Sequence, residues 1–585
     1  MKEKNTGKAN ASSDSSVLES LGRISDKIKG LSDKVEKIPG KKPEFIVVAL
    51  YSICHFLMLA VHEPWFDEAL AWLIAKDSTV YELLFEIPHY EGHPALWHLS
   101  LMPFAKLGAP YEISLSLVTF IFAGGAIALF VFKSAFPRII RLLAPFTYFM
   151  FYQFGVVSRP YCMMMLAFFL LAVFYGRRNE KPGRYVLSLL FLCATSAYGI
   201  VMAGGLTIAW IVELWMESSN KKQDKQMKQR VTTFWKSLCE HGKIGWLCFL
   251  LIYALFVIRR ILPAEDTYAS AMSDGSEKTG LALRLIYMVF GSTADSFITN
   301  TFSSESVLNS ANIGTVELIG SVLIGAGILF LMVRAGRRRH MLLSLCIPYL
   351  LTTVFMALVY ASRHHIGIIY LFIMFWLWTV LDEAGKDEKP GEKKNINPYG
   401  VIIPLVAAVC MLIPLYWSIS SAIIDVFQPY SWGRDEARFL KENDLTGRTI
   451  LAQWEGMPGI NGESSNAITF CSRVTYLLPY LDEDNFLNSI HQMGEGFGML
   501  HKIPERALTE QLIENIRADE VPDIVTGNVS YYSIYGADGI DMNDYVCVHS
   551  EQAGLIWKGV PEPVNNKIFV KKELAEEKKL KVIGK

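Results

Sequence analysis

The chain has 585 residues, of which 51% are hydrophobic and 19% charged, and its formal net charge is −1. A soluble protein spreads its apolar residues along the sequence, whereas here they gather in long runs, which excludes a purely soluble enzyme. Basic residues are confined to short stretches and do not indicate a nucleic-acid-binding face. The composition therefore indicates an integral membrane protein without a nucleic-acid partner.

The first 43 residues are polar, but apolar residues recur among them in alternating steps of four and three, from Val17 to Ile38. This spacing is typical of a coiled-coil seam and predicts a homo-oligomer through residues 17–38. An amphipathic helix lying on the membrane surface is the alternative. We interpret residues 1–43 as a cytoplasmic tail, because no small-residue cleavage site follows the first apolar run.

Residues 44–424 carry the apolar runs and are predicted to form the transmembrane domain. A helix of about 20 residues crosses the hydrocarbon layer, and most of the runs approach or exceed this length. The runs are 44–61, 113–132, 143–158, 160–176, 185–216, 244–258, 316–333, 341–360, 366–381 and 400–423. Residues 94–108 are interpreted as a tilted or partial span. We expect about 11 to 13 crossings in a polytopic α-helical membrane protein.

Lysine and arginine in short loops predict the orientation, since such loops stay in the cytoplasm. The basic loops are 41–42, 133–141, 177–184, 221–230, 334–339 and 386–394. The N-terminus is then cytoplasmic, and the first outer loop (62–95) and everything after about residue 425 face outward. The expected location is a bacterial cell membrane.

Residues 425–585 change in character and predict an extracytoplasmic α/β domain. Short alternating or β-branched stretches predict strands, and longer mixed stretches predict helices. The predicted strands are 448–454, 466–472, 523–529, 544–550 and 566–572, and the predicted helices are 482–499 and 506–518. Cys471 and Cys547 lie in this region, where a disulfide between them is an alternative to two free thiols.

The first outer loop contains Asp67 and Glu68, in the first turn of a helix that Pro64 opens. The helix dipole alone can explain acidic residues at this position. However, the neighbouring Trp65 and Phe66 are typical of a helix at the membrane interface, where a carboxylate pair faces lipid head groups. An ionised carboxylate there is suited to act as a general base.

Three further segments carry polar residues at predicted outer helix ends. Each also has a purely structural interpretation. His93, before Pro94, can cap the end of a helix, and Arg159 and Arg363 can anchor their helices at the membrane surface. The candidates are His93, Arg159, Tyr161, Arg363, His364 and His365.

Asp67-Glu68-Ala69, followed by His93-Pro94-Ala95-Leu96, resembles the signature of the GT-C class of membrane glycosyltransferases. The similarity is to the protein mannosyltransferase and aminoarabinose transferase branch (glycosyltransferase family 39), although Ala95 replaces the second proline of the family's motif. Ser158-Arg159-Pro160-Tyr161 and, more weakly, Ser362-Arg363-His364-His365 are similar to elements at outer helix ends of this class. The ordered set, spanning residues 62–365, carries the resemblance.

The resemblance implies an inverting transfer from a polyprenyl-phosphate-linked sugar to a hydroxyl group of a glycan, lipid or protein. Asp67 would be the base, and Glu68 would orient the acceptor or help to hold a divalent cation. The donor phosphate would meet Arg159, Arg363, His364 and His365, and the sugar or acceptor would meet His93 and Tyr161. Ligand spacing in the sequence predicts no metal site and no cofactor.

Two other classes of function stay open. A transporter or flippase for lipid-linked sugars would carry ionisable residues near mid-membrane and a repeat between its halves, and neither is evident in the sequence. A polymer ligase of the cell envelope would use the same kind of donor without requiring Asp67 and Glu68.

Overall fold

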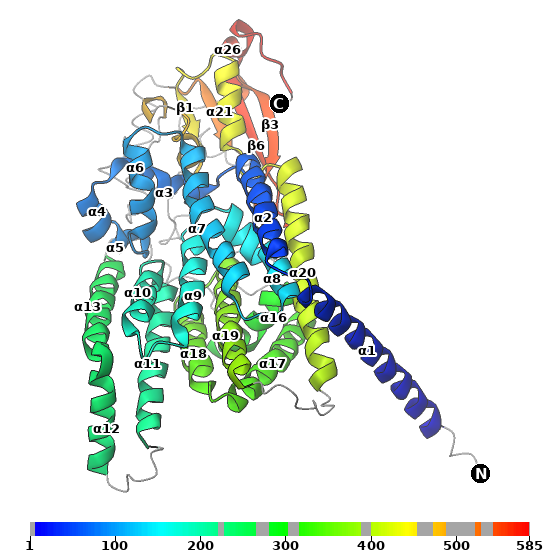
Figure 1. Ribbon diagram of the computed structural model, residues 1–585. Helices are drawn as coiled ribbons and strands as arrows, with labels where there is room; N and C mark the ends of the chain where they lie inside the picture. Colours follow the sequence, from blue (N-terminus) through cyan, green and yellow to red (C-terminus); the bar gives the residue numbers. More distant parts are fainter. Residues whose placement is uncertain are drawn as a thin grey trace.

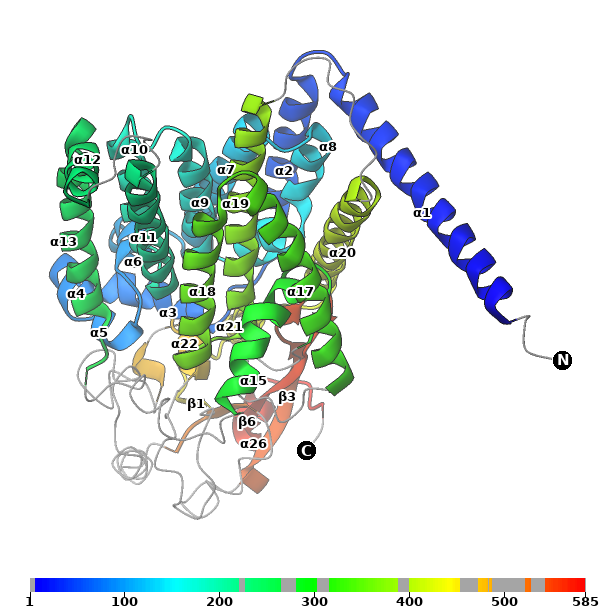
Figure 2. The ribbon, with the colours of Figure 1, turned by 90° about the horizontal axis from the view of Figure 1, so that it is seen from below.

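The computed structural model describes residues 6–219, 227–264, 280–301, 315–387, 399–452, 472–481, 483–486, 521–527 and 542–583. Its helices form a bundle, and a small sheet covers one end of that bundle (Figure 1). Helix α1 (Thr6–Glu36) runs away from the bundle in both views (Figures 1 and 2). It covers residues 17–36 of the helix predicted at 17–38, whose pairing with a second copy stays a prediction.

Eight helical segments of the described residues are long and apolar enough to cross a membrane. They are Lys42–Val61 (α2), Tyr111–Lys133 (α7), Arg138–Val156, Ala197–Ser218 (in α11), Gln229–Ile261, Thr315–Arg338 (α17), Arg363–Gly385 and Val401–Phe427. Three shorter apolar helices accompany them, namely Tyr161–Tyr175 (α9), Pro182–Cys193 (α10) and Leu342–Leu358 (α18). The prediction of a polytopic helical membrane protein is confirmed.

Several of these segments are built from more than one element. The span at 138–156 consists of α8 (Arg138–Leu143), η1 (Ala144–Phe146) and the π-helix η2 (Phe149–Val156). The remaining elements of the bundle are α11 (Ala197–Ser219), α12 (Met227–Cys239), η3 (Glu240–Gly242), α13 (Lys243–Ile261), α15 (Leu281–Ile286), η4 (Tyr287–Gly291), α16 (Ser292–Phe297), η6 (Arg363–His365), α19 (Ile366–Asp387) and α20 (Tyr399–Phe427). The predicted run at 185–216 thus divides between α10 and α11.

The first loop and the segment after it fold into four short helices beside the bundle. They are α3 (Phe66–Asp77), α4 (Val80–Phe85), α5 (Pro88–Glu91) and α6 (Leu96–Lys106). Helix α6 has 11 residues, a length of about 16 Å, which is about half the thickness of the hydrocarbon layer. The segment at 94–108 is therefore too short to cross.

Two contacts show which segment ends lie together. Arg138 Nε lies 2.8 Å from Glu44 Oε1, so α2 and α8 begin at the same end of the bundle. Ser158 N donates to Glu68 Oε1 at 2.6 Å, so the first loop and the end of η2 meet at the other end. With α6 not crossing, the basic loop 133–141 and the N-terminal tail share one end, as the Lys/Arg distribution requires.

Close backbone packing explains why η2 carries a glycine near its end. A Cβ atom at Gly155 would lie 3.0 Å from Met150 O and 3.1 Å from Tyr51 Oη. The ring of His55 occupies the same side, with Nε2 2.7 Å from Gly155 O. A larger side chain at this position would crowd Tyr51 and His55 of α2 against η2, the segment that leads to Arg159.

After α20 the chain forms the small sheet and its covering helices. The elements are α21 (Gly433–Glu442), β1 (Ile450–Ala452), α22 (Ser472–Leu477), η7 (Glu483–Asn485), β2 (Ile524–Gly527), η11 (Met542–Asp544), β3 (Tyr545–Ala553), β4 (Ile556–Trp557), β5 (Val560–Pro561), β6 (Val564–Lys571) and α26 (Lys572–Glu577). The main sheet has the order β1-β2-β6-β3, with β1 and β2 parallel and the other neighbours antiparallel.

This arrangement confirms the predicted strands at 448–454, 523–529, 544–550 and 566–572. The strand predicted at 466–472 lies outside the described residues except for Ser472, which begins helix α22. Most of the predicted helices at 482–499 and 506–518, and Cys471 with its proposed disulfide, also lie outside them.

The β4–β5 hairpin fastens the sheet region to the bundle. Lys558, at its turn, donates from Nζ to Thr299 O at 2.8 Å, and Trp557 Nε1 donates to Asn300 Oδ1 at 2.7 Å. Gly559 N donates to Ser421 Oγ of α20 at 2.8 Å. These contacts bring the segment after β5, which contains Glu562, close to the helix end that carries Arg363.

Candidate active site

Glu68 joins the first loop to the segment before α9. Its side chain is fully buried, and its Oε2 accepts a hydrogen bond from Trp65 N at 3.0 Å, which closes the first turn of α3. Its Oε1 accepts the hydrogen bond from Ser158 N, one residue before Arg159. Glu68 thereby fixes Arg159 relative to Asp67.

A buried ionic network around His62 contacts Glu68 at this junction. His62 Nδ1 lies 2.8 Å from Asp425 Oδ2, and His62 Nε2 lies 3.4 Å from Glu68 Oε2. Burial lowers the pKa of His62, but the two carboxylates outweigh it and raise the pKa to about 10. The imidazolium therefore connects α2, α3 and α20. The sequence alone did not predict this network, because Asp425 is remote from His62 along the chain.

Asp67 and Arg159 form an ion pair at the surface of this junction. Arg159 Nη2 lies 2.7 Å from Asp67 Oδ2, and the side chains are 11% and 30% exposed, respectively. Burial raises the pKa of Asp67, the Arg159 charge opposes this rise, and the Glu68 charge adds to it. Asp67 is thus a partly exposed carboxylate with an elevated pKa, next to a guanidinium group.

Arg159 also connects the pair to a third segment of the chain. Its Nη1 lies 3.1 Å from His364 Nε2. Its guanidinium carbon lies 5.2 Å from the ring centre of Tyr161 and 5.6 Å from that of Trp65, within the range of cation–π contacts. The structure therefore brings the first loop, the 158–161 segment and the 362–365 segment together at one end of the bundle.

Several polar atoms around the pair are buried without a hydrogen-bond partner among the described residues. They are Trp65 Nε1, His93 Nδ1, His98 Nε2 and Tyr161 Oη. Burial, together with the Arg159 charge, lowers the pKa of His93 to about 4, so its ring is neutral. Such atoms also occur elsewhere in the described residues, but here several of them gather near one ion pair, where they offer hydrogen bonds to a polar ligand.

Glu91 is a second carboxyl group close to Asp67, and sequence reasoning did not select it. Burial raises its pKa to about 7, the Asp67 charge adds to the rise and Arg159 opposes it. Its Oε2 lies 3.9 Å from His98 Nε2. The sequence signal was its place just before Gly92-His93, but only the folding of α4 and α5 brings it back to Asp67.

The remaining predicted residues lie beside this cluster in a different arrangement. Arg363 forms a bidentate ion pair with Glu562, in which Nη2 lies 2.7 Å from Oε2. Its guanidinium carbon lies 5.4 Å from the ring centre of Trp557. His365 is buried in the turn, where its Nδ1 accepts from Ser362 N at 2.9 Å. Arg363 is therefore directed toward the sheet region, whereas His364 is directed toward Arg159.

No protein-family model and no curated protein matches the chain. Among solved structures it is similar to the arabinofuranosyltransferase AftD from mycobacteria, at 12% identity and a TM-score of 0.35, covering 92% of this chain and 40% of that one. A mutant of the same protein gives 12% identity, a TM-score of 0.33, and coverage of 91% and 42%. The chain thus spans about two fifths of these structures, and a likeness this slight carries no inference about activity.

Proposed function

We propose that the protein is an inverting glycosyltransferase of the outer face of a bacterial cell membrane. It would move a sugar from a polyprenyl-phosphate donor to a hydroxyl group of a glycan, lipid or protein. The observation that carries the proposal is the Asp67–Arg159 pair at one end of the bundle, with its 2.7 Å contact. The unpartnered polar atoms around it and the motif resemblance support the same reaction.

The pair offers the two groups that such a transfer requires. Asp67 takes the proton from the acceptor hydroxyl, and the acceptor oxygen attacks the anomeric carbon from the face opposite the phosphate. The bond between that carbon and the phosphate oxygen breaks, and its electron pair stays on the phosphate. Arg159 stabilises this charge, since a guanidinium group matches two phosphate oxygens.

The same contact would connect donor binding to the strength of the base. A phosphate at Arg159 competes with Asp67 for the guanidinium group. Arg159 opposes the rise in the Asp67 pKa, so a phosphate that takes over this cation makes Asp67 a stronger base. The carboxylate would then be most basic when the donor is in place.

Other residues take supporting roles in this proposal. Glu68 positions Arg159, because both of its oxygens already accept backbone hydrogen bonds, an arrangement that favours positioning over holding a divalent cation. His93 and Tyr161 offer unpartnered atoms to the sugar or the acceptor. Arg363 would reach the phosphate after release from Glu562, and His364 and His365 would complete that side.

The place of the ion pair also bears on the alternatives. A transporter or flippase needs polar groups along a path through the membrane. Asp67 lies in α3, outside the spanning segments, and its partner Arg159 lies between η2 and α9. This position favours chemistry at the membrane surface over translocation.

Mass spectrometry of envelope glycans, glycoproteins and lipid-linked sugars tests the proposed function. Deleting the gene should remove one sugar from a glycan or protein and cause the corresponding lipid-linked sugar to accumulate. The wild-type gene should restore the product, and Asp67→Asn, expressed at the same level, should not. An unchanged envelope profile would contradict the proposal, and full restoration by Asp67→Asn would favour transport.

A further inference from the structure

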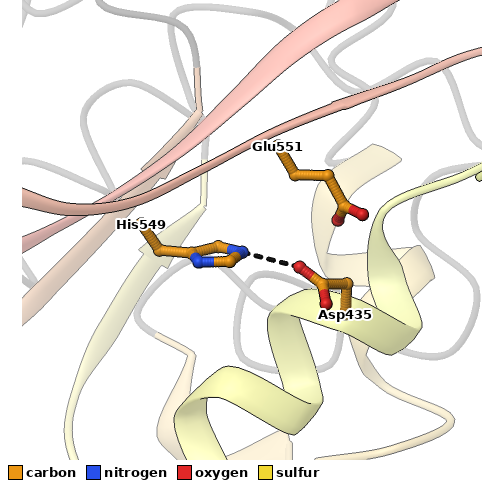
Figure 3. A group of neighbouring side chains, drawn as sticks. All are labelled: Asp435, His549 and Glu551. Carbon is orange, nitrogen blue, oxygen red and sulfur yellow. Dashed lines mark hydrogen bonds and ion pairs between the residues drawn. The ribbon is translucent and has the colours of Figure 1, made fainter. Parts of the chain in front are cut away.

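Three side chains of metal-binding type converge between α21 and β3 (Figure 3). Asp435, His549 and Glu551 each offer a ligand atom, and these atoms all lie within 4.8 Å of one another. His549 Nε2 lies 2.6 Å from Asp435 Oδ2. Asp435 belongs to the first turn of α21, whereas His549 and Glu551 are two residues apart in β3. The cluster thus joins a helix to a strand.

A β-bulge in β3 creates this convergence. Cys547 pairs with Phe569 of β6, but His549 pairs with Ile568, so Val548 is an extra residue. One extra residue moves all later side chains of a strand to the other face. Without the bulge, with Val548 as a regular strand residue, the side chains of His549 and Glu551 would share the face of Cys547.

The face that His549 and Glu551 occupy is the face that packs on α21. Glu551 pairs directly with Asn566 of β6, and cross-strand partners lie on the same face. Asn566 Nδ2 donates to Glu436 Oε2 of α21 at 2.6 Å. The bulge therefore directs both side chains toward the helix that carries Asp435.

The carboxylate of Glu551 points toward Asp435 (Figure 3), and its Oε2 atom is buried without a hydrogen-bond partner among the described residues. Two neighbouring carboxylates repel each other unless a proton or a cation lies between them. The site therefore offers an unused oxygen where a cation would be favourable.

We propose that Asp435, His549 and Glu551 bind one divalent cation of the zinc type, which holds the sheet against α21. One imidazole nitrogen and two carboxylate oxygens are a ligand set that Zn²⁺ accepts, with water in the fourth position. The His549 ring is already oriented, because it stacks on Phe439 with ring centres 4.6 Å apart. Arg438, which pairs with Asp435, is 60% exposed, so its side chain can turn toward solvent and leave Asp435 to the cation.

This cation would also strengthen the contact between the sheet region and the first loop. Arg434 N, one residue before Asp435, donates to Glu63 Oε1 at 2.5 Å, and Ser431 Oγ donates to Pro64 O at 2.8 Å. Glu63 and Pro64 lead directly into α3. The site is separate from the Asp67–Arg159 pair, so this proposal stands without the glycosyltransferase assignment.

Zinc binding to the purified full-length protein tests the proposal. The protein is stripped with a chelator, equilibrated with Zn²⁺ alone, and its bound metal is measured by elemental mass spectrometry. The wild type should bind one more Zn²⁺ per chain than His549→Ala, and Glu551→Gln should weaken that site by at least the roughly 10- to 100-fold that the loss of an outer-shell partner costs. Asp444→Asn is the matched control, because Asp444 lies just after α21, is 89% exposed and pairs with Lys578 instead.

X-ray absorption at the zinc edge of the wild type keeps the test independent of variant folding. Scattering from an imidazole and from oxygen atoms at about 2.0 Å would support the site. Equal zinc binding by the wild type and His549→Ala, or a spectrum explained by sulfur ligands alone, would overturn it.

Discussion

Asp67→Asn is expected to lower the rate of sugar transfer by a factor of about 10² to 10⁴, the usual contribution of a general base. The amide keeps the shape of the side chain but cannot accept the proton of the acceptor hydroxyl. The measurement is release of polyprenyl phosphate by the purified protein in lipid vesicles. The donor is the lipid-linked sugar that accumulates in the deletion strain, and extracted envelope material supplies the acceptor.

Two further variants make this result specific. Asp77→Asn changes an exposed carboxylate at the other end of α3 and should leave the rate unchanged. A rate for Asp67→Asn within about tenfold of the wild type would contradict the assignment of the base. In that case Glu91→Gln decides whether the neighbouring carboxyl group performs this step.

Arg159→Ala is expected to raise the donor KM by about tenfold to 100-fold, since a hydrogen bond to a charged group contributes about 1.5–3 kcal/mol. The KM for the acceptor should change much less. Arg159 also keeps the pKa of Asp67 from rising further. Its removal raises that pKa, and because the base must be deprotonated, the acidic limb of kcat/KM should move to higher pH.

Arg363→Ala provides the matched comparison. It should also weaken donor use if Arg363 reaches the phosphate, but it should not move the acidic limb, because Arg363 pairs with Glu562 and not with Asp67. Arg177→Ala, an exposed arginine just after α9, should change neither quantity. Unchanged donor titrations for both Arg159→Ala and Arg363→Ala would mean that the two arginines only anchor their helices.

The sequence predicted features that depend on local composition. Hydropathy located the spans because every spanning helix must be apolar along about 20 residues. Strands such as the one at 544–550 could be recognised from alternation and β-branched residues. The side on which each loop lies stays a prediction from Lys and Arg, and the short α6 agrees with it, because the N-terminal tail and the loop 133–141 lie at the same end of the bundle.

Features that depend on contacts between distant segments could not be predicted. The positioning role of Glu68 rests on its hydrogen bond from Ser158 N, and the charge of His62 rests on Asp425. Likewise, His549 meets Asp435 across 114 residues, and only through a bulge that shifts the register by one residue. Such contacts leave no periodic signal in a single sequence.

The central claim is that Asp67 and the sheet region share the outer face of the membrane, and cysteine labelling in intact cells tests it. In a version of the chain without its nine cysteines, single cysteines replace the exposed residues Lys76, Glu573 and Arg177 in turn. An impermeant thiol reagent should label positions 76 and 573 in intact cells, and position 177 only after permeabilisation.

The opposite pattern, with position 177 labelled and the other two protected, would contradict the account. Asp67 would then face the cytoplasm, and a nucleotide-sugar enzyme or a transporter would explain the chain better. Labelling of position 573 with protection of position 76 would also contradict it, because the bilayer would separate the first loop from the sheet region.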